Sequence, residues 1–232
     1  MSFPARLLLV AALHFALPAA AGEAPYLTAS QVDLLRLLPP PPKAGSAQAD
    51  AEMAEVLALQ ASRSPERTAQ ALADQAEGVF DIFGATLGPL FTATSLPMTT
   101  RLFGRIGDTD EAVLGAAKDG FARQRPFLAN PAVQTPLRRS RSGSYPSGHA
   151  TRATMTAIVL AALVPEQREA IFGRVPSYIE SRVIGGMHFR SDVVAGRLAG
   201  TAIAAVLMND PGFLADFDAA RRELRPALGL TP

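Results

Sequence analysis

The chain contains no cysteine and no tryptophan, and few of its residues are aromatic or histidine. Without cysteine there is no disulfide, no thiol nucleophile and no zinc site built from thiolates. Aromatic residues make up only 6% of the 232 residues, whereas alanine is abundant. This balance favours closely packed helices over a sheet built from β-branched and aromatic side chains.

The chain also lacks a large net charge of either sign. It has 22 Lys and Arg against 21 Asp and Glu, a formal net charge of +1. This gives no global reason to expect nucleic-acid binding, so any anion must be recognised by a local cluster of cations. With 48% hydrophobic residues, the length suits one well-filled domain, and we expect it to span residues 22–232.

Residues 1–21 have the pattern of a secretory signal peptide. Arg6 supplies the positive start, Leu7 to Leu17 is largely apolar, and Ala19 to Ala21 offers small residues for cleavage. This apolar stretch, like those at 153–164 and 193–208, is shorter than the ~20 residues that a membrane span requires. We therefore expect an exported protein with no stable membrane span, periplasmic if the source is Gram-negative.

Hydrophobic periodicity predicts an all-α fold, a single-domain helical bundle, since no segment shows the alternation of a strand. Ser64-Pro65 is typical of a helix start, and this helix is expected to run to about Val79. The apolar segment at 80–91 is expected to pack in the core around a helix break. Further helices are predicted at 32–38, 46–63, 97–106, 108–124, 147–163, 165–185, 190–208 and 211–226, and residues 126–145 form a connection rich in Pro and Arg.

Only two histidines, His149 and His188, follow the predicted signal peptide. Pro146-Ser147-Gly148 leads directly into His149 at a predicted helix start, where free backbone N–H groups attract anions. Gly148 lets a phosphate approach the backbone closely, and Ser147 can donate its hydroxyl. Taken alone, Ser147 would be an ordinary helix cap, and the adjacent histidine is what argues for a larger role.

Three cations, Lys118, Arg125 and Arg182, lie in the same region of the chain as the two histidines. Arginine presents a planar set of donors suited to phosphate, and lysine adds a point charge. Each alone would usually be a solvated residue on a helix face. The sequence has no cluster of carboxylates and histidines that could hold two metal ions. We therefore expect phosphate to be bound by cations and amide donors, with no metal and no other cofactor.

His188 is followed four residues later by Asp192, a spacing that puts both on one face of a helical backbone. A carboxylate that accepts the Nδ1 proton fixes the tautomer and leaves the Nε2 lone pair for attack. His188 is therefore the predicted nucleophile, Asp192 its orienting partner and His149 the general acid. An isolated His-x3-Asp pair is more often structural, so the prediction depends on His149.

The spacing of these residues resembles the type 2 phosphatidic acid phosphatase and haloperoxidase superfamily. The motifs K-x6-R-P, P-S-G-H and S-R-x5-H-x3-D occur in order, beginning at Lys118, Pro146 and Ser181. Residues 143–149, G-S-Y-P-S-G-H, further resemble the signature of class A bacterial non-specific acid phosphatases, with Ala150 in place of its Thr. The resemblance implies that Lys118, Arg125 and Arg182 bind the phosphate. It also implies hydrolysis of phosphate monoesters through a phosphohistidine, broad specificity and phosphotransfer as a side activity.

Other functions of the same residues stay open on the sequence alone. A vanadium-dependent haloperoxidase would hold vanadate in the phosphate site, because vanadate resembles the phosphoryl transition state. A lipid phosphatase would act at a membrane, and a non-catalytic periplasmic protein would bind phosphate through the cations alone. The class A signature, the short chain and the two histidines favour the acid phosphatase. The sequence does not decide the preferred ester or whether the chain forms a homo-oligomer.

Overall fold

The computed structural model of the protein describes residues 23–231, so the predicted signal peptide at 1–21 lies outside the described residues. Within that range the chain is helical and contains no strand, which confirms the all-α prediction. The helices are α1 (Leu34–Leu37), α2 (Ala47–Ser62), α3 (Pro65–Ala73), α4 (Val79–Leu87), α5 (Pro97–Phe121), α6 (Pro126–Ala129), α7 (Gly148–Leu163), α8 (Arg168–Ile184), α9 (Arg190–Leu207) and α10 (Pro211–Ala227), with a short 3-10 turn at Pro165–Gln167.

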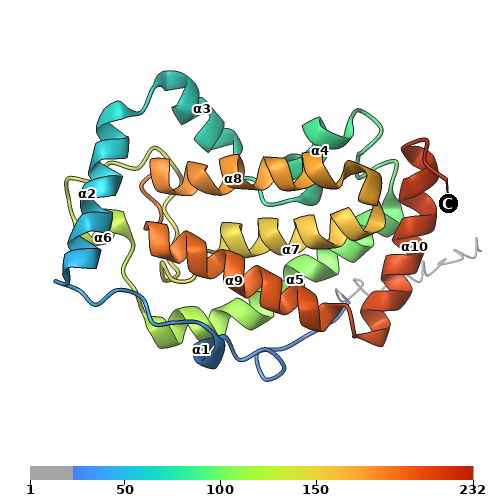
Figure 1. The fold of residues 1–232 in the computed structure, drawn as a ribbon, viewed down its shortest axis with the longest axis horizontal. Helices are drawn as coiled ribbons and strands as arrows, with labels where there is room; N and C mark the ends of the chain where they lie inside the picture. The colour runs from blue at the N-terminus through green and yellow to red at the C-terminus, as the bar shows by residue number, and fades with distance from the viewer. Residues whose placement is uncertain (1–22, 232) are drawn as a thin grey trace, which may run out of the picture.

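α7 lies at the centre of the bundle and packs most extensively against α9 and α8 (Figure 1). It is buried on nearly all sides, as expected of a helix whose apolar residues are not confined to one face. Short turns connect α7 to α8 and α8 to α9, so α8 runs opposite to its two neighbours. The beginnings of α7 and α9 and the ends of α5 and α8 therefore lie at the same end of the molecule.

Two glycines of α9 allow it to approach α7 very closely. A Cβ atom added at Gly196 would lie 2.5 Å from the Ser147 carbonyl oxygen, and one at Gly200 would lie 2.4 Å from that of Thr151. Both neighbours are backbone atoms, which cannot turn aside as a flexible side chain would. The close approach fixes the first turns of α7 against α9.

Gly200→Ala is therefore expected to destabilise the protein by about 1–3 kcal/mol, because the added methyl group must push the two helices apart. Gly173 on α8 is the matched control, since no atom lies within 4 Å of a Cβ added there. Gly173→Ala should raise stability by roughly 0.5–1 kcal/mol through the helix propensity of alanine. Urea unfolding measures both variants, and equal midpoints would contradict this account of the α7–α9 contact.

One predicted interruption of a helix is wrong. α5 is one helix rather than the two expected at 97–106 and 108–124, because Gly107 stays helical and its carbonyl accepts a hydrogen bond from Arg152. The helix break expected within 80–91 is present at Gly88, with φ +90°, where α4 ends. The connection at 126–145, for which no helix was predicted, begins with the short helix α6.

The early end of α3 has the largest consequence for the site. The sequence predicts a longer helix, but α3 ends just before Asp74, whose buried carboxylate binds the Ser181 hydroxyl at 2.6 Å and the Arg174 guanidinium at 2.5 Å. Both partners lie on α8. Residues 74–78 therefore form a loop rather than a helix, and this loop brings Glu77 to the beginning of α7.

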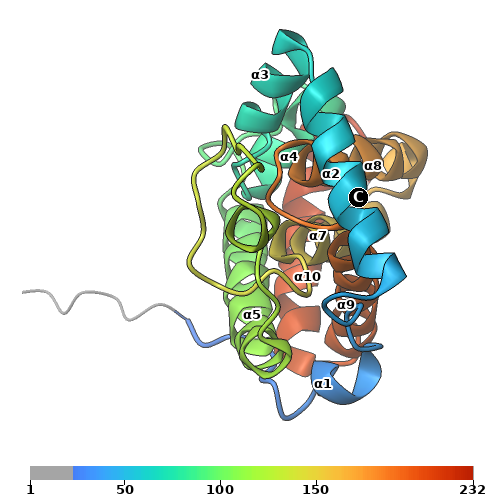
Figure 2. The ribbon, with the colours of Figure 1, turned by 90° about the vertical axis from the view of Figure 1, so that its left-hand side faces the viewer.

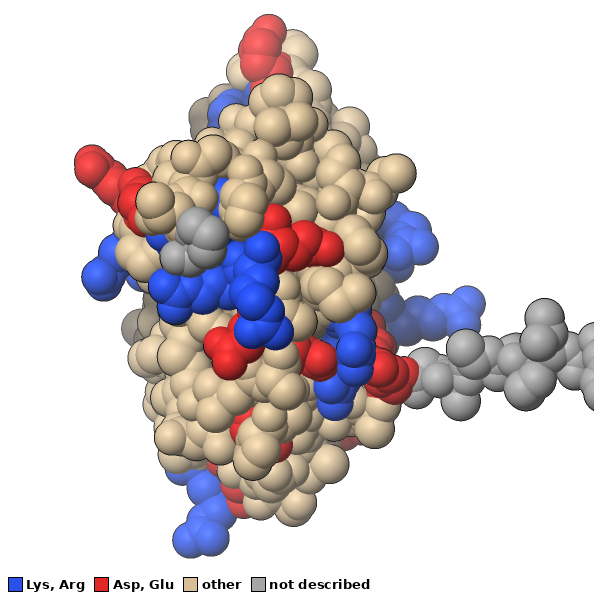
Figure 3. All heavy atoms as spheres, turned by 90° about the vertical axis from the view of Figure 1, so that its right-hand side faces the viewer, with Lys and Arg blue, Asp and Glu red and all other residues tan. Residues whose placement is uncertain are grey.

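The opposite end of the molecule, at α10, carries charges of both signs. Figure 3 shows Lys and Arg side chains gathered there with Asp and Glu side chains beside them. On α10 itself, Arg225 Nη2 lies 2.8 Å from Glu166 Oε1. In the part of the chain that the structure describes, no single helix is long and apolar enough to cross a membrane. α9 and α10 reach the necessary length and hydropathy only when they are taken together, and the chain bends by 93° between them.

Candidate active site

A cleft of about 740 Å³ opens where α5 and α8 end and α7 and α9 begin. Figure 2 views this end of the molecule, with the segment between α6 and α7 lying in front of α5 and α7. Most of the predicted site residues line the cleft, namely Lys118, Arg125, Gly148, His149, Arg182 and His188. Ser147 and Asp192 are buried directly behind this lining. The structure thus brings all eight predicted residues together.

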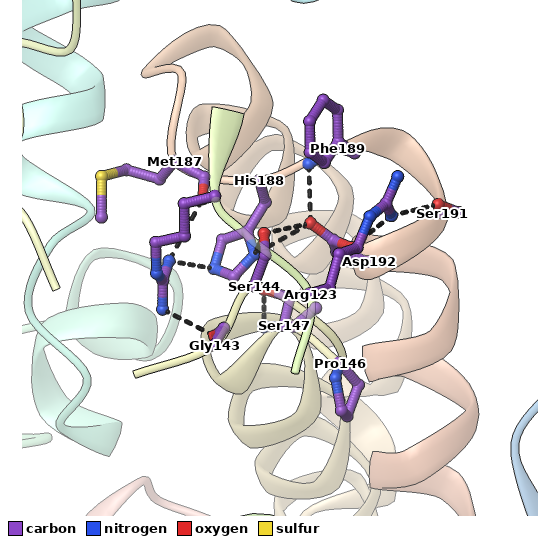
Figure 4. A network of polar contacts seen from close by, with 12 residues as sticks. Arg123, Gly143, Ser144, Pro146, Ser147, Met187, His188, Phe189, Ser191 and Asp192 are labelled. Atoms are coloured by element: carbon purple, nitrogen blue, oxygen red, sulfur yellow. Dashed lines mark hydrogen bonds and ion pairs between the residues drawn. The ribbon is translucent and has the colours of Figure 1, made fainter. Parts of the chain in front are cut away.

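His188 lies in the turn between α8 and α9 and is only 1% exposed. Its Nδ1 lies 3.4 Å from Oδ2 of Asp192, which belongs to the first turn of α9 (Figure 4). Its Nε2 points to the other side, 3.0 Å from Nη1 of Arg125. The carboxylate therefore holds the ring with Nε2 directed towards the cations of the cleft, as nucleophilic attack requires.

Two side chains that the sequence prediction did not include also hold Asp192. The Ser144 hydroxyl donates to Oδ2 at 2.5 Å, and Arg123 Nη1 donates to Oδ1 at 2.6 Å. Arg123 in turn pairs with Glu52 of α2 at 2.7 Å. Burial raises the pKa of Asp192, but the hydrogen bond from His188 and the charge of Arg123 outweigh it, so the pKa lies below its ordinary value.

The environment of His188 keeps its ring neutral. Burial is the main reason that the pKa of His188 is lowered to about 3; the charge of Arg125 acts in the same direction, and the hydrogen bond to Asp192 acts against it. At any pH well above this value the imidazole keeps a lone pair on one nitrogen. With the Nδ1 proton directed at Asp192, that lone pair is on Nε2.

The three predicted phosphate-binding cations converge on the cleft from α5, from the residue before α6 and from α8. Lys118 Nζ donates to the Pro146 carbonyl at 2.7 Å, and Arg125 Nη2 donates to that of Gly143 at 3.2 Å. Nε and Nη1 of Arg182, a residue only 3% exposed, make no hydrogen bond with any described residue. A buried guanidinium without acceptors is costly, so a bound anion would stabilise this side chain.

Burial and the repulsion of neighbouring cations lower the pKa values of Lys118 and Arg125. Burial, followed by the charge of Arg125, lowers the pKa of Lys118 to about 8. Burial, followed by the charge of Arg182, lowers the pKa of Arg125 to about 10. All three side chains are therefore still positively charged at acid pH, and a phosphate dianion among them relieves the repulsion.

Ser147 and Gly148 direct the beginning of α7 towards the cleft. The Ser147 Oγ accepts a weak hydrogen bond from the Ala150 N–H at 3.4 Å, and the Ser147 N–H donates to the Asp192 carbonyl at 2.9 Å. Ser147 is thus the helix cap that its position suggested, and its hydroxyl proton is still available for a phosphate oxygen. The first N–H groups of α7 have no partner within the helix and suit an anion in the cleft.

His149 lies in the first turn of α7, and both of its ring nitrogens face acceptors from the loop at 74–78. Nδ1 lies 3.1 Å from Oε1 of Glu77, and Nε2 lies 3.3 Å from the Gln75 carbonyl oxygen. The ring also stacks on Tyr178 of α8. Burial, followed by the charge of Arg182, lowers the pKa of His149 well below its ordinary value.

An acidic wall that the sequence prediction missed continues from Glu77. Arg152 of α7 lies 3.7 Å from Oε2 of Glu77 and 3.0 Å from Oδ2 of Asp110 on α5. Burial raises the pKa of Asp110 to about 7, against the opposing charge of Arg152. Glu77, Asp110 and Arg152 all line the cleft, so the wall beside His149 differs in charge from the cationic wall beside His188.

Comparison with known proteins agrees with this geometry. Residues 109–214, which include every predicted site residue, match the family model described as the PAP2 superfamily. A non-specific acid phosphatase of Providencia stuartii is 34% identical over 212 residues, covering 85% of this chain and 84% of the relative. The chain belongs to the PAP2 superfamily, as a class A acid phosphatase.

Two further relatives extend the comparison. An acid phosphatase of Zymomonas mobilis is 32% identical over 207 residues, covering 84% of this chain and 76% of the relative. The crystal structure of a transmembrane PAP2-type phosphatidylglycerolphosphate phosphatase from Bacillus subtilis has a TM-score of 0.50 and 21% identity, covering 76% of this chain and 90% of that one. At that identity the structural likeness bears on the fold alone, which is the all-α fold of PAP2 phosphatases.

Proposed function

We propose that this acid phosphatase is exported and hydrolyses a broad range of phosphate monoesters through a phosphohistidine on His188. The observation that carries the proposal is the orientation of His188, with Asp192 at Nδ1 and the cations of the cleft at Nε2. A lone His-x3-Asp pair could be structural, but a neutral, fixed imidazole directed at clustered cations suits attack on a bound phosphate.

In the first step Nε2 of His188 attacks phosphorus, and the bond from phosphorus to the ester oxygen breaks. Protonated His149 gives a proton to the departing oxygen, so the alcohol leaves neutral. Lys118, Arg125 and Arg182 stabilise the charge on the phosphoryl oxygens. For this step Arg125 must exchange its contact with Nε2 for one with phosphate. Asp192 meanwhile stabilises the positive charge of the phosphorylated ring.

In the second step a water molecule attacks phosphorus while neutral His149 takes one of its protons, and the bond between phosphorus and Nε2 breaks. Inorganic phosphate is released, and His149 is again protonated. An alcohol in place of water would accept the phosphoryl group by the same route, which gives the proposed phosphotransferase side activity. The cleft is much larger than a phosphate group, which supports broad specificity. The signal-peptide pattern at 1–21 supports export to the periplasm.

The decisive experiment is to trap the covalent intermediate. Rapid alkaline quenching during turnover of a labelled phosphate monoester should leave label on the protein, and peptide mapping should place it on His188. The label should be lost in acid, since phosphohistidine is stable in alkali and labile in acid. Excess EDTA should leave turnover unchanged, because no step uses a metal ion. Label on another residue, or activity lost to EDTA, would overturn the proposal.

A further inference from the structure

Among the described residues, Glu77 is the carboxylate that contacts His149 directly. Its Oε1 lies 3.1 Å from Nδ1 of His149, and its side chain is 37% exposed in the cleft. Arg152 lies 3.7 Å from the other oxygen, and the buried Asp110 holds Arg152 in place at 3.0 Å. The contact therefore belongs to a connected series of polar contacts and does not depend on one freely rotating surface side chain.

The other groups around His149 do not favour a proton on its ring. The charged and titratable groups that face it are Arg182 and Tyr178 from α8, His188 from the turn before α9, Arg152 from α7 and Glu77 from the loop at 74–78. Burial and the charges of Arg182, His188 and Arg152 all oppose the imidazolium. The Gln75 carbonyl and the Glu77 carboxylate are the acceptors that favour it.

We propose that Glu77 is a positioning residue for the general acid: its carboxylate fixes the His149 ring beside the cleft and stabilises its protonated form. The inference rests on the proposed role of His149. When the ester bond breaks, the imidazolium passes one ring proton to the departing oxygen, an N–H bond breaks and an O–H bond forms, and the ring becomes neutral. Glu77 thus supports His149 as Asp192 supports His188, although Glu77 lies in the loop at 74–78 and Asp192 lies in α9.

The test compares the effect of Glu77→Gln on kcat/KM for substrates with different leaving groups. An alkoxide is a poor leaving group and needs its proton, whereas p-nitrophenolate leaves readily without one. Glu77→Gln should therefore lower kcat/KM for an alkyl phosphate by about tenfold or more, but that for p-nitrophenyl phosphate by less than about threefold. A carboxylate 3.1 Å from Nδ1 favours the protonated ring, so its removal should move the alkaline limb of the kcat/KM profile to lower pH.

Glu111→Gln is the matched control, because Glu111 lies on the rim of the same cleft, is 79% exposed and pairs with Arg152 at 3.6 Å. It should leave both substrates and the pH profile unchanged. Equal behaviour of the two variants, a uniform loss on both substrates without a pH shift, or a general rise in kcat/KM would overturn the role of Glu77. His188→Ala, measured in parallel, separates the two proposals: activity retained there would overturn the proposed function instead.

Discussion

Replacing His188 with alanine should lower kcat for p-nitrophenyl phosphate by about 10⁴-fold or more, because the step that forms the covalent intermediate loses its nucleophile. A water molecule in its place would be a weaker nucleophile and would lack the orientation that Asp192 gives the ring. The other histidine among the described residues, His149, faces Glu77 and Gln75 and is not oriented by Asp192. Steady-state turnover measures the loss, and the label trapped by alkaline quenching should disappear with it.

Binding of inorganic phosphate separates loss of the nucleophile from loss of the fold. Lys118, Arg182 and the beginning of α7 stay in place in His188→Ala, so phosphate should still bind. At about 100 times its Kd, phosphate should raise the free energy of unfolding of the variant by roughly 2.7 kcal/mol. Phosphate stabilisation without turnover is the expected result. Turnover within about tenfold of the wild type would show that His188 is not the nucleophile.

Short motifs at helix ends account for the part of the site that the sequence predicts correctly. Ser147 was predicted to start a helix, and it caps α7. The four-residue spacing of His188 and Asp192 was enough to predict that the two side chains face each other, as the structure shows. In both cases the geometry depends on local backbone conformation, which a few neighbouring residues determine.

The residues that the sequence did not reveal act through contacts between distant segments. Arg123 joins Asp192 of α9 to Glu52 of α2, and nothing in the spacing of these three residues indicates that they meet. Ser144 lies within the class A signature at 143–149, and this is the one sequence signal that points to it. Glu77 lies in a stretch for which the sequence predicts a longer helix, and this prediction hides it. The helix in fact ends at Asp74, because the buried Asp74 carboxylate binds side chains about a hundred residues later.

Asp192→Asn should lower kcat by about 10³- to 10⁴-fold with little change in KM, because it alters the tautomer of His188 and leaves the phosphate-binding cations untouched. The carboxylate accepts hydrogen bonds on both oxygens, Oδ1 from Arg123 and Oδ2 from Ser144 and the Phe189 N–H. An asparagine has one acceptor oxygen for these donors. If its amide nitrogen faces His188, Nδ1 must accept and the proton moves to Nε2, which then has no lone pair for attack.

The opposite orientation of the amide does not restore activity at low cost, because its nitrogen would then face the Arg123 guanidinium, donor against donor, in a nearly buried pair. Asp216→Asn is the matched control, since Asp216 is 8% exposed and pairs with Arg105 at the α10 end of the molecule. Both variants should lower the urea midpoint, but only Asp192→Asn should lower kcat. If Asp192→Asn kept kcat within about tenfold of the wild type, the orienting carboxylate would be structural and the tautomer argument would fail.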